Sequence, residues 1–442
     1  MKKFFLLPLF FSVVLSLPAQ NWTPMASGYL PDNVVIFSIS AVGEDVVWAI
    51  ASEEYYQAPI PTSHRPWVLR TSDGGLSWSA AEVEEAGGTI CFQIVAEDSL
   101  TAWITTQDYG SGAGRALYKT TDGGINWAKK LADNSGGVAL YRFADGQHWL
   151  AQNRRRLSLS PTNGDTWVND SIIGYNANEF QILYSGANLS NTVGDTVWSG
   201  TDGGRVIRIT NYGENAEFFN TPLGTATTIT SVAFQDHLNG LCFSRNLNNN
   251  NRIARSTDGG ATWAALAKQP GNTTGWNIAA VPGTPGFYVL ASNYNFSQGK
   301  VAITTDFGES WALEDLGQSL NAVVFTGPTS GWIGGGRIAS SETQPALFKY
   351  TGSPLVGSKE ILPSLPGFSV SPNPAGDVVH FNFDGFTGQE NMTASMTDLA
   401  GRVVFFGKIS GNKLDISTLD AGIYFLKIEM EEKAGWAKVI KE

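Results

Sequence analysis

The sequence predicts an all-β protein, namely a seven-bladed β-propeller followed by a small C-terminal β-sandwich. Three observations carry this prediction. A box phrase of the type Thr-Asp-Gly-Gly-x-x-Trp recurs along residues 21–356, and a short aromatic or apolar run precedes each copy. The repetition then stops at a stretch rich in Pro, Gly and Ser. With 49 glycines, 12% aromatic residues and only 16% charged residues, the chain fits one large β body with a small second domain.

The first element is a leader over residues 1–19. Two lysines precede the apolar run Phe4–Leu17, and small residues follow up to Ala19. This order is typical of a secretory signal peptide. A membrane anchor is the alternative, but the run is shorter than the roughly 20 residues that a spanning helix needs. We therefore expect cleavage after Ala19 and no membrane span in the mature protein.

The charge balance excludes two classes of partner. The formal net charge is −11, and cleavage of the leader would remove Lys2 and Lys3, which makes the mature chain more acidic still. Binding to nucleic acid depends on Lys and Arg, so neither nucleic acid nor an anionic membrane is an expected partner. The basic run Arg154–Arg156 is expected to be an exposed strand or loop edge. The two cysteines, Cys91 and Cys242, are expected in buried strands of different modules, and a disulfide between them is the less favoured alternative.

The propeller is expected over residues 20–352. The box phrase recurs at roughly the 40–50-residue period of a four-stranded blade. Four full copies end in Trp78, Trp127, Trp263 and Trp311, and two degenerate copies at 160–167 and 209–216 lie between them. The phrase therefore occurs six times. The aromatic or apolar strands number seven: Val47–Trp48, Ala102–Trp103, His148–Trp149, Val197–Trp198, Leu241–Cys242, Phe287–Tyr288 and Gly331–Trp332. Seven modules follow.

Each module parses as four short strands, and the last one lacks its fourth. In the second module, the expected strands are 89–97, 100–106, 115–120 and 125–131. In the seventh, they are 320–326, 331–333 and 346–350. Residues Asn21–Met25 look like the missing strand. We expect them to pair with Ala346–Tyr350 and close the ring, which removes an open sheet edge.

The box phrase has a physical logic. Its Asp can accept backbone N–H bonds across a tight turn, its glycines allow positive φ, and its Trp buries a large ring between sheets. The chain here resembles the Asp-box, or BNR-repeat, propellers, a family that includes sialidases, sortilin-type receptors and photosystem assembly factors. The resemblance implies that the boxes lie on the rim opposite the ligand-binding face and are structural. The box residues are Asp73, Trp78, Asp122, Trp127, Trp167, Asp258, Trp263, Asp306 and Trp311.

A linker over residues 353–366 and a small antiparallel sandwich over 367–442 complete the chain. The ordered segments of this tail resemble the type A C-terminal sorting domain of the type IX secretion system of Bacteroidota. That resemblance implies the secretion machinery as a partner, and passage through the periplasm to the medium or the outer cell surface. An ordinary immunoglobulin-like accessory module is the alternative. The residues that carry the resemblance are Pro372, Asn373, Pro374, Asp398, Gly401, Gly422, Tyr424 and Lys441.

The loops between second and third strands should lie on the rim opposite the box phrases, and four of them are long: 52–67, 107–115, 246–251 and 293–297. They carry residue types that stack on or hydrogen-bond to sugars and peptides. Ordinary solvated loops are the alternative. The candidate ligand-binding residues are Tyr55, Tyr56, His64, Arg65, Trp67, Tyr109 and Tyr294, and the weak candidates for catalytic carboxylates are Glu53, Glu54 and Asp108.

The sequence favours a non-catalytic scaffold that binds a glycan or a protein. Four scattered histidines and two cysteines form no zinc pattern, and no phosphate or calcium loop is present, so no metal or cofactor is expected. A secreted glycoside hydrolase is the first alternative, and a chaperone similar to the assembly factors is the second. A sialidase is disfavoured because the Arg-Ile-Pro motif of that family is absent, and its ring has six blades.

Overall fold

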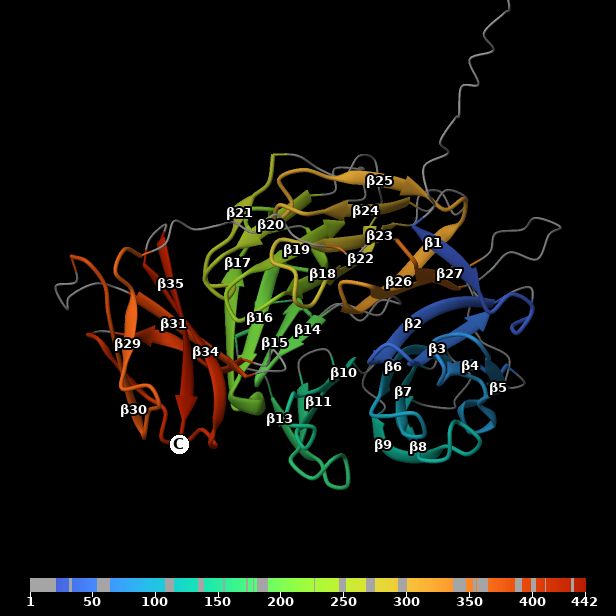
Figure 1. Ribbon diagram of the computed structural model, residues 1–442. Helices are drawn as coiled ribbons and strands as arrows, with labels where there is room; N and C mark the ends of the chain where they lie inside the picture. Colours follow the sequence, from blue (N-terminus) through green and yellow to red (C-terminus); the bar gives the residue numbers. More distant parts are fainter. Residues whose placement is uncertain are drawn as a thin grey trace, which may run out of the picture.

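The computed structural model describes residues 21–442 except for 32–33, 54–63, 108–114, 134–138, 154–155, 172–173, 178, 181–189, 226, 246–251, 268–274, 293–299, 337–346, 353–354, 356–364, 386–391, 399–402, 410 and 431–432. The described residues form a β-propeller followed by a C-terminal β-sandwich (Figure 1). Two short 3-10 turns, η1 (Glu84–Ala86) and η2 (Asn211–Gly213), interrupt the strands.

Four consecutive strands make each of the first six blades, in simple antiparallel order. Blades one and two contain β2 (Val34–Val42), β3 (Val46–Glu53), β4 (Trp67–Thr71), β5 (Ser79–Glu82), β6 (Ile90–Ala96), β7 (Ala102–Gln107), β8 (Arg115–Thr120) and β9 (Ala128–Asp133). Blades three and four contain β10 (Ala139–Arg142), β11 (Trp149–Asn153), β12 (Arg156–Ser160), β13 (Val168–Ser171), β14 (Ser190–Val193), β15 (Thr196–Gly200), β16 (Arg205–Thr210) and β17 (Asn215–Asn220). The second blade thus has the four strands that were expected there.

Blades five and six follow the same order, with β18 (Thr228–Phe234), β19 (Gly240–Arg245), β20 (Arg252–Ser256), β21 (Ala264–Ala265), β22 (Gly275–Ala280), β23 (Tyr288–Ser292), β24 (Lys300–Thr304) and β25 (Ala312–Asp315). The seventh blade contains β26 (Ser319–Gly327), β27 (Ser330–Gly336) and β28 (Leu347–Tyr350), with β1 (Trp22–Met25) as its outer strand. A bridge between Val35 and Gly336 joins the seventh blade to the first.

The chain closes the ring with its first strand, which confirms the expected pairing. β1 runs antiparallel to β28, with Trp22 opposite Tyr350 and Met25 opposite Leu347. The Trp22 ring is 1% exposed and lies edge-on to the rings of Tyr350 and Phe325. A strand from one end of the chain therefore completes the blade at the other end and covers its open edge.

Three consecutive glycines in β27 allow the first blade to approach the seventh. A Cβ on Gly335 would lie 1.8 Å from the carbonyl oxygen of Ser319, and one on Gly336 would lie 2.3 Å from a methyl group of Val35. A side chain at Gly335 would have to move the backbone of Ser319 in the same blade, and one at Gly336 would have to displace Val35 of the first blade. Glycine in the interior of a strand often marks such a close approach, and here it lets the two blades share a bridge.

Each box phrase forms a turn between the third and fourth strands, and the preceding blade packs onto it. A Cβ on Gly75, the second glycine of the first box turn, would lie 2.8 Å from the Trp332 ring of blade seven. The same close contact joins Gly124 to Trp48 and Gly260 to Trp198. In these blades the two sequence repeats form one contact, because the Trp of the second strand covers the glycine of the next box turn.

Cations from the third strands strengthen these contacts between blades. Lys349 lies over the ring of Trp332 and donates a 2.8 Å hydrogen bond to the carbonyl oxygen of Gly74 in blade one. In blade four, Arg208 donates from Nη1 to the carbonyl oxygen of Gly259 in blade five, at 3.2 Å. Each such contact satisfies a turn carbonyl and holds neighbouring blades in register.

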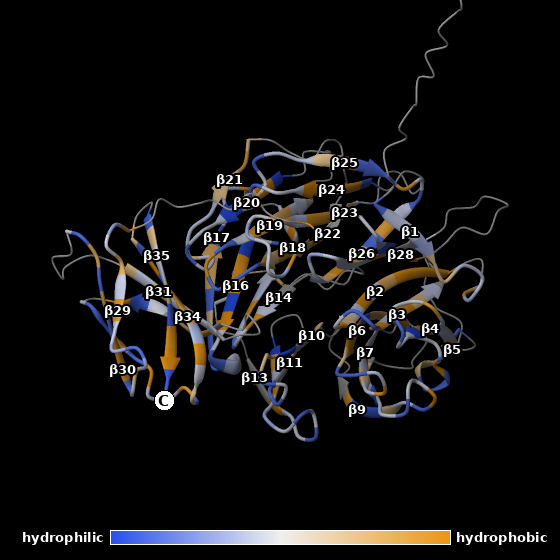
Figure 2. Cartoon of the chain, in the orientation of Figure 1, coloured by the Kyte–Doolittle hydropathy of each residue, from blue (hydrophilic) through white to orange (hydrophobic). Residues whose placement is uncertain are grey.

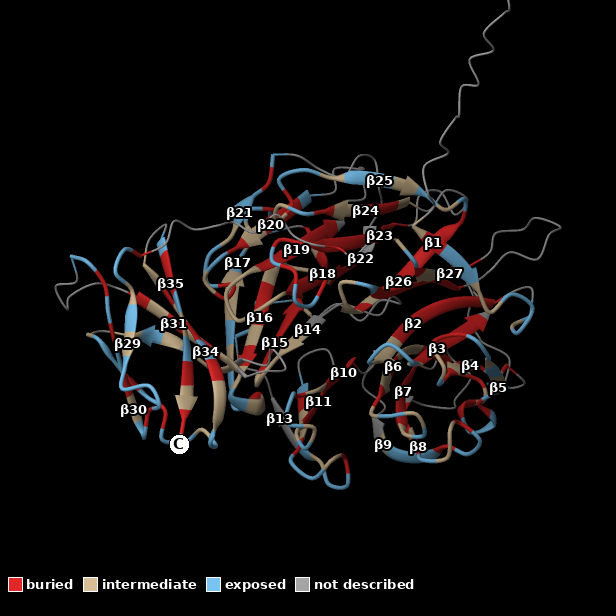
Figure 3. Cartoon of the chain, in the orientation of Figure 1, coloured by how far each residue is buried: buried red, intermediate tan, exposed pale blue. Residues whose placement is uncertain are grey.

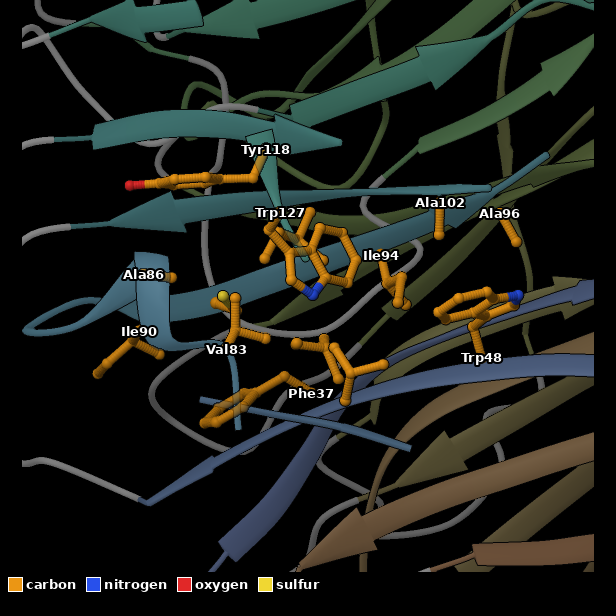
Figure 4. Close-up of a cluster of buried hydrophobic side chains, with 14 of the residues drawn as sticks. Phe37, Trp48, Val83, Ala86, Ile90, Ile94, Ala96, Ala102, Tyr118 and Trp127 are labelled. Carbon is orange, nitrogen blue, oxygen red and sulfur yellow. The ribbon is translucent and has the colours of Figure 1, made fainter. Parts of the chain in front are cut away.

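The buried core lies between the blades. Figure 3 shows burial along the inner strands, such as β2 and β19, and exposure on outer strands such as β17 and β25. The hydropathy of Figure 2 follows the same pattern along β2. Between blades one and two, Phe37 and Trp48 meet Ile94 and Trp127 in a continuous apolar cluster (Figure 4). The two cysteines, in β6 and β19, are both buried and unpaired.

The C-terminal sandwich has two antiparallel sheets. One contains β29 (Ser369–Ser371), β30 (Val378–Asn382) and β33 (Lys413–Asp415), and the other contains β31 (Met392–Asp398), β32 (Val403–Ile409), β34 (Gly422–Met430) and β35 (Lys433–Lys441). Phe381, Met396 and Leu426 are among the buried residues between them. The sandwich has a core of its own, as the sequence predicts.

Candidate binding face

The loops between second and third strands lie at the end of the blades opposite the box turns, because successive strands are antiparallel. Of the candidate residues on these loops, the structure describes His64, Arg65 and Trp67. Glu53 ends β3, but its side chain lies outside the described residues, and so do Glu54, Tyr55, Tyr56, Asp108, Tyr109 and Tyr294. The roles assigned to those positions stay predictions.

Buried hydroxyl groups close the bases of four of these loops. We call them the neck hydroxyls: Ser52, Thr106, Ser244 and Ser292, near the ends of β3, β7, β19 and β23. Thr106 accepts a 3.0 Å bond from the N–H of Ala116 and donates to its carbonyl oxygen at 3.2 Å. Ser244 donates to the carbonyl oxygen of Arg252 at 3.2 Å, and Lys300 N–H donates to Ser292 at 3.1 Å. Each bond ties the strand before a loop to the strand after it.

In the first blade, a side chain replaces the backbone as the partner of the neck hydroxyl. Ser52 Oγ lies 2.8 Å from His64 Nε2, and both residues are buried, at 0% and 6% exposure. The carbonyl oxygen of His64 accepts bonds from Gly88 N–H at 2.9 Å and from Arg65 Nη1 at 3.0 Å. Arg65 also pairs with Glu84 at 3.1 Å. His64 and Arg65 therefore fix the base of the loop 54–63.

On the opposite rim, the four box carboxylates accept hydrogen bonds inside their own turns. Asp73 accepts from Ser77 N–H at 2.9 Å and from Thr71 Oγ1 at 2.7 Å. Asp122, Asp258 and Asp306 repeat the pattern. Bonds from the Ser77 hydroxyl and N–H lower the pKa of Asp73 to about 2. In the worn third copy, Thr162 takes the place of Asp and its hydroxyl accepts from Thr166 N–H at 2.9 Å.

Four of the five box tryptophans share one contact as well. The indole N–H of Trp127 donates to the carbonyl oxygen of Gly124, three residues earlier, at 3.2 Å. Trp167, Trp263 and Trp311 make the equivalent bond in their own turns. Trp78 packs edge-on against Trp332 of blade seven, with 5.7 Å between ring centroids. These rings hold their turns against the neighbouring strands.

A buried ion pair on the loop face escaped the sequence analysis. Glu179 is 3% exposed, pairs with Arg205 and accepts a 2.6 Å bond from the hydroxyl of Thr201. Burial alone would raise the pKa of Glu179, but the hydrogen bonds from Arg205 and Thr201 outweigh it and lower the pKa. Arg205 also donates to the carbonyl oxygen of Gly174 at 2.8 Å. The pair thus docks the connection between blades three and four onto the short turn after β15.

The residues of the tail motif hold the edge of the last strand. The Asn373 side chain donates to the carbonyl oxygen of Lys438 at 2.6 Å and accepts from Ile440 N–H at 2.8 Å, as a paired strand would. Pro372 and Pro374, on either side, both follow cis peptide bonds. Lys441 is 8% exposed and pairs with Asp377 at 3.2 Å.

Three further motif residues lie on β31 and β34. Tyr424 donates from its hydroxyl to the carbonyl oxygen of Asp420 at 2.8 Å and pairs across the sheet with Asp398. Gly422 lies opposite Lys441. Gly401 lies outside the described residues.

Two features of the sequence mark these contacts. A small polar residue stands near the end of several second strands, and a cation precedes the box in Arg70, Lys119 and Arg255. Glu179 had no comparable signal, because nothing in the repeat marks its position. Within the part of the chain that the structure describes, no group of three or more His, Cys, Asp or Glu residues could hold a metal ion.

Comparison with known families identifies the tail. Residues 369–442 match the model of the secretion system C-terminal sorting domain. Proteins with this domain are exported by type IX secretion, so the chain is directed to the cell surface or the extracellular space. In the described residues, no helix is long and apolar enough to cross a membrane. No curated protein matches the chain.

Solved structures are similar to the chain in fold. A structure of YCF48 bound to a D1 peptide is 15% identical, with a TM-score of 0.52, and the match covers 76% of this chain and 99% of that one. YCF48 from Cyanidioschyzon merolae is 14% identical, with a TM-score of 0.52 and coverage of 75% and 99%. PorZ of Porphyromonas gingivalis is 13% identical, with a TM-score of 0.46 and coverage of 92% and 59%. The two YCF48 structures agree with the propeller fold.

Proposed function

We propose that this β-propeller, which carries a secretion system C-terminal sorting domain, is a non-catalytic protein that binds a glycan or a protein partner at the loop face. In this proposal, residues 1–19 are a cleaved signal peptide, 20–352 the propeller, 353–366 a linker and 367–442 the sorting domain. The Asp-box residues serve the fold, because their carboxylates are occupied within their own turns.

The observation that carries the proposal is the set of neck hydroxyls. The four loops that the sequence marks as long are the four whose bases these bonds close. A long loop loses conformational entropy when it becomes ordered on a ligand, and fixing its two ends beforehand reduces that loss. Binding sites are commonly built from loops that a rigid framework positions. A ring of stiff blades with fixed loop bases supports recognition at this face.

The test combines a search for ligands with a matched pair of variants. The exported protein is applied to a glycan array and used to capture proteins from the cell surface fraction. We expect a specific ligand, and we expect Thr106→Val to weaken its binding by roughly tenfold, the equivalent of 1.4 kcal/mol. The control is Thr105→Val in the same strand, because the buried Thr105 hydroxyl has no hydrogen-bond partner within the described chain. It should leave the affinity unchanged.

Two results would count against the proposal. Equal affinities for the Thr106→Val and Thr105→Val proteins would show that the loop bases do not serve binding. Hydrolysis of a polysaccharide, without any captured ligand, would favour the alternative of a secreted glycoside hydrolase. In that case, replacing Glu53, Glu54 and Asp108 together with their amides should abolish turnover, since such enzymes need two carboxylates.

A further inference from the structure

A cavity of about 540 Å³ lies inside the ring, away from the loop face. The first strand of each of the seven blades contributes to it. The lining residues lie in the C-terminal half of each of these strands, just before the turn to the second strand. This is the end of the blades that carries the box turns. Pockets that hold small molecules in proteins span about 300–1,000 Å³, so the cavity has the size of a ligand site.

The lining of the cavity is mixed. Small aliphatic side chains such as Val95, Val193 and Val324 are partly exposed in it. The side-chain amide of Gln93 is already engaged. It donates to the carbonyl oxygen of Leu140 in the next blade and accepts from the N–H of Leu140, both at 2.8 Å. The aliphatic part of the lining therefore suits the apolar part of an amphipathic ligand.

Arg142 is the one charged side chain among the described residues that line the cavity. Its Nε is buried and has no hydrogen-bond partner within the described chain. The guanidinium lies 5.9 Å from the Trp149 ring centroid and so close to Gly146 that a Cβ there would be 2.8 Å from Nη2. Packing therefore holds the cation at the end of β10, beside the cavity.

The neighbouring carboxylate does not neutralise this cation by direct contact. Asp98 feels the charge of Arg142, but its Oδ1 already accepts from Leu100 N–H and Thr101 N–H, at 2.7 and 2.8 Å. No ion pair joins Asp98 to Arg142 in the described part of the chain. In a protein with a net charge of −11, a cavity with one cation and no anion in its lining favours a ligand of opposite sign.

We infer that the central cavity binds a small amphipathic carboxylate, with its apolar body along the inner strands and its carboxylate on Arg142. A guanidinium offers a planar pair of donors that matches a carboxylate. This site is separate from the loop face and does not depend on the ligand proposed there.

Decanoate is the probe, and titration calorimetry on the exported protein is the measurement. Decanoate should bind at least about tenfold more tightly than decanol, since a hydrogen bond to a charged group contributes about 1.5–3 kcal/mol and each 1.4 kcal/mol is tenfold. Arg142→Gln should remove this preference and leave decanol binding unchanged. Arg142→Lys should retain part of it. The matched control is Arg156→Gln, on an exposed residue of β12 away from the cavity lining, which should change neither affinity.

Three results would overturn the inference. Equal affinity for decanoate and decanol would show that no cation selects the ligand. An unchanged preference in Arg142→Gln would place the cation elsewhere. The absence of binding by both probes would show that the cavity takes no apolar chain. Thermal unfolding of each variant shows whether it is folded, and the comparison between two probes on the same protein does not depend on a variant at all.

Discussion

Replacement of Trp22 by alanine should lower the free energy of unfolding of the propeller by about 3–5 kcal/mol, the usual cost of deleting a large buried aromatic side chain. The ring is 1% exposed and is packed between Phe325 and Tyr350. Its strand is also tied to blade six, because Asn21 donates twice to the Glu314 carboxylate at 3.1 Å. Removing the ring loosens the strand that closes the propeller.

Thr23→Ala is the matched control for this prediction. Thr23 lies next in the same strand, and its exposed hydroxyl bonds to Thr351 at 2.9 Å. Its loss should cost no more than about 0.5 kcal/mol, as for most surface substitutions. Equilibrium unfolding in urea measures both variants. A Trp22→Ala protein as stable as the Thr23→Ala protein would mean that β1 does not close the ring.

Glu179→Ala should destabilise the protein by about 3–5 kcal/mol, because it leaves the Arg205 cation buried without its partner. The side chains of Arg205 and Glu179 are 11% and 3% exposed, so solvent cannot replace the lost contact. The hydroxyl of Thr201 and the N–H of Asn176 would lose their acceptor as well. Urea unfolding of the variant is the measurement.

The control for the second prediction is an exposed ion pair in the same blade. Arg208 pairs with Glu217, whose side chain is 55% exposed. Glu217→Ala should cost at most about 1 kcal/mol, the upper range for a surface pair. If both variants lose the same small amount of stability, the buried pair is not what docks the connection onto blade four.

The sequence was most informative where the repeat and the chain ends supplied a constraint. The spacing of the box phrase predicted the ring, and the missing strand of the last module predicted the pairing of β1 with β28, which the structure confirms. The ordered tail motifs predicted the sorting domain, which the family comparison confirms.

What the sequence did not reveal depends on contacts between distant residues. Arg205 begins a strand of the repeat but Glu179 lies in the connection between two blades, so no periodicity brings them together. The sequence shows Trp48 and Gly124 as members of two separate repeats, the second-strand aromatic and the box glycine. That the two residues touch depends on the angle between neighbouring blades. The central cavity could not be predicted, because its lining comes from seven different strands and no single strand carries a pattern that indicates a cavity.

Cell fractionation of a chain truncated after residue 366 tests the central claim, that this is an exported propeller directed by its tail. The full chain and the truncated chain are expressed in a host with type IX secretion, and protease accessibility reports surface exposure. We predict that the full chain reaches the surface or the medium, while the truncated chain stays in the periplasm with a folded, protease-resistant propeller. Equal export of both chains would contradict the account.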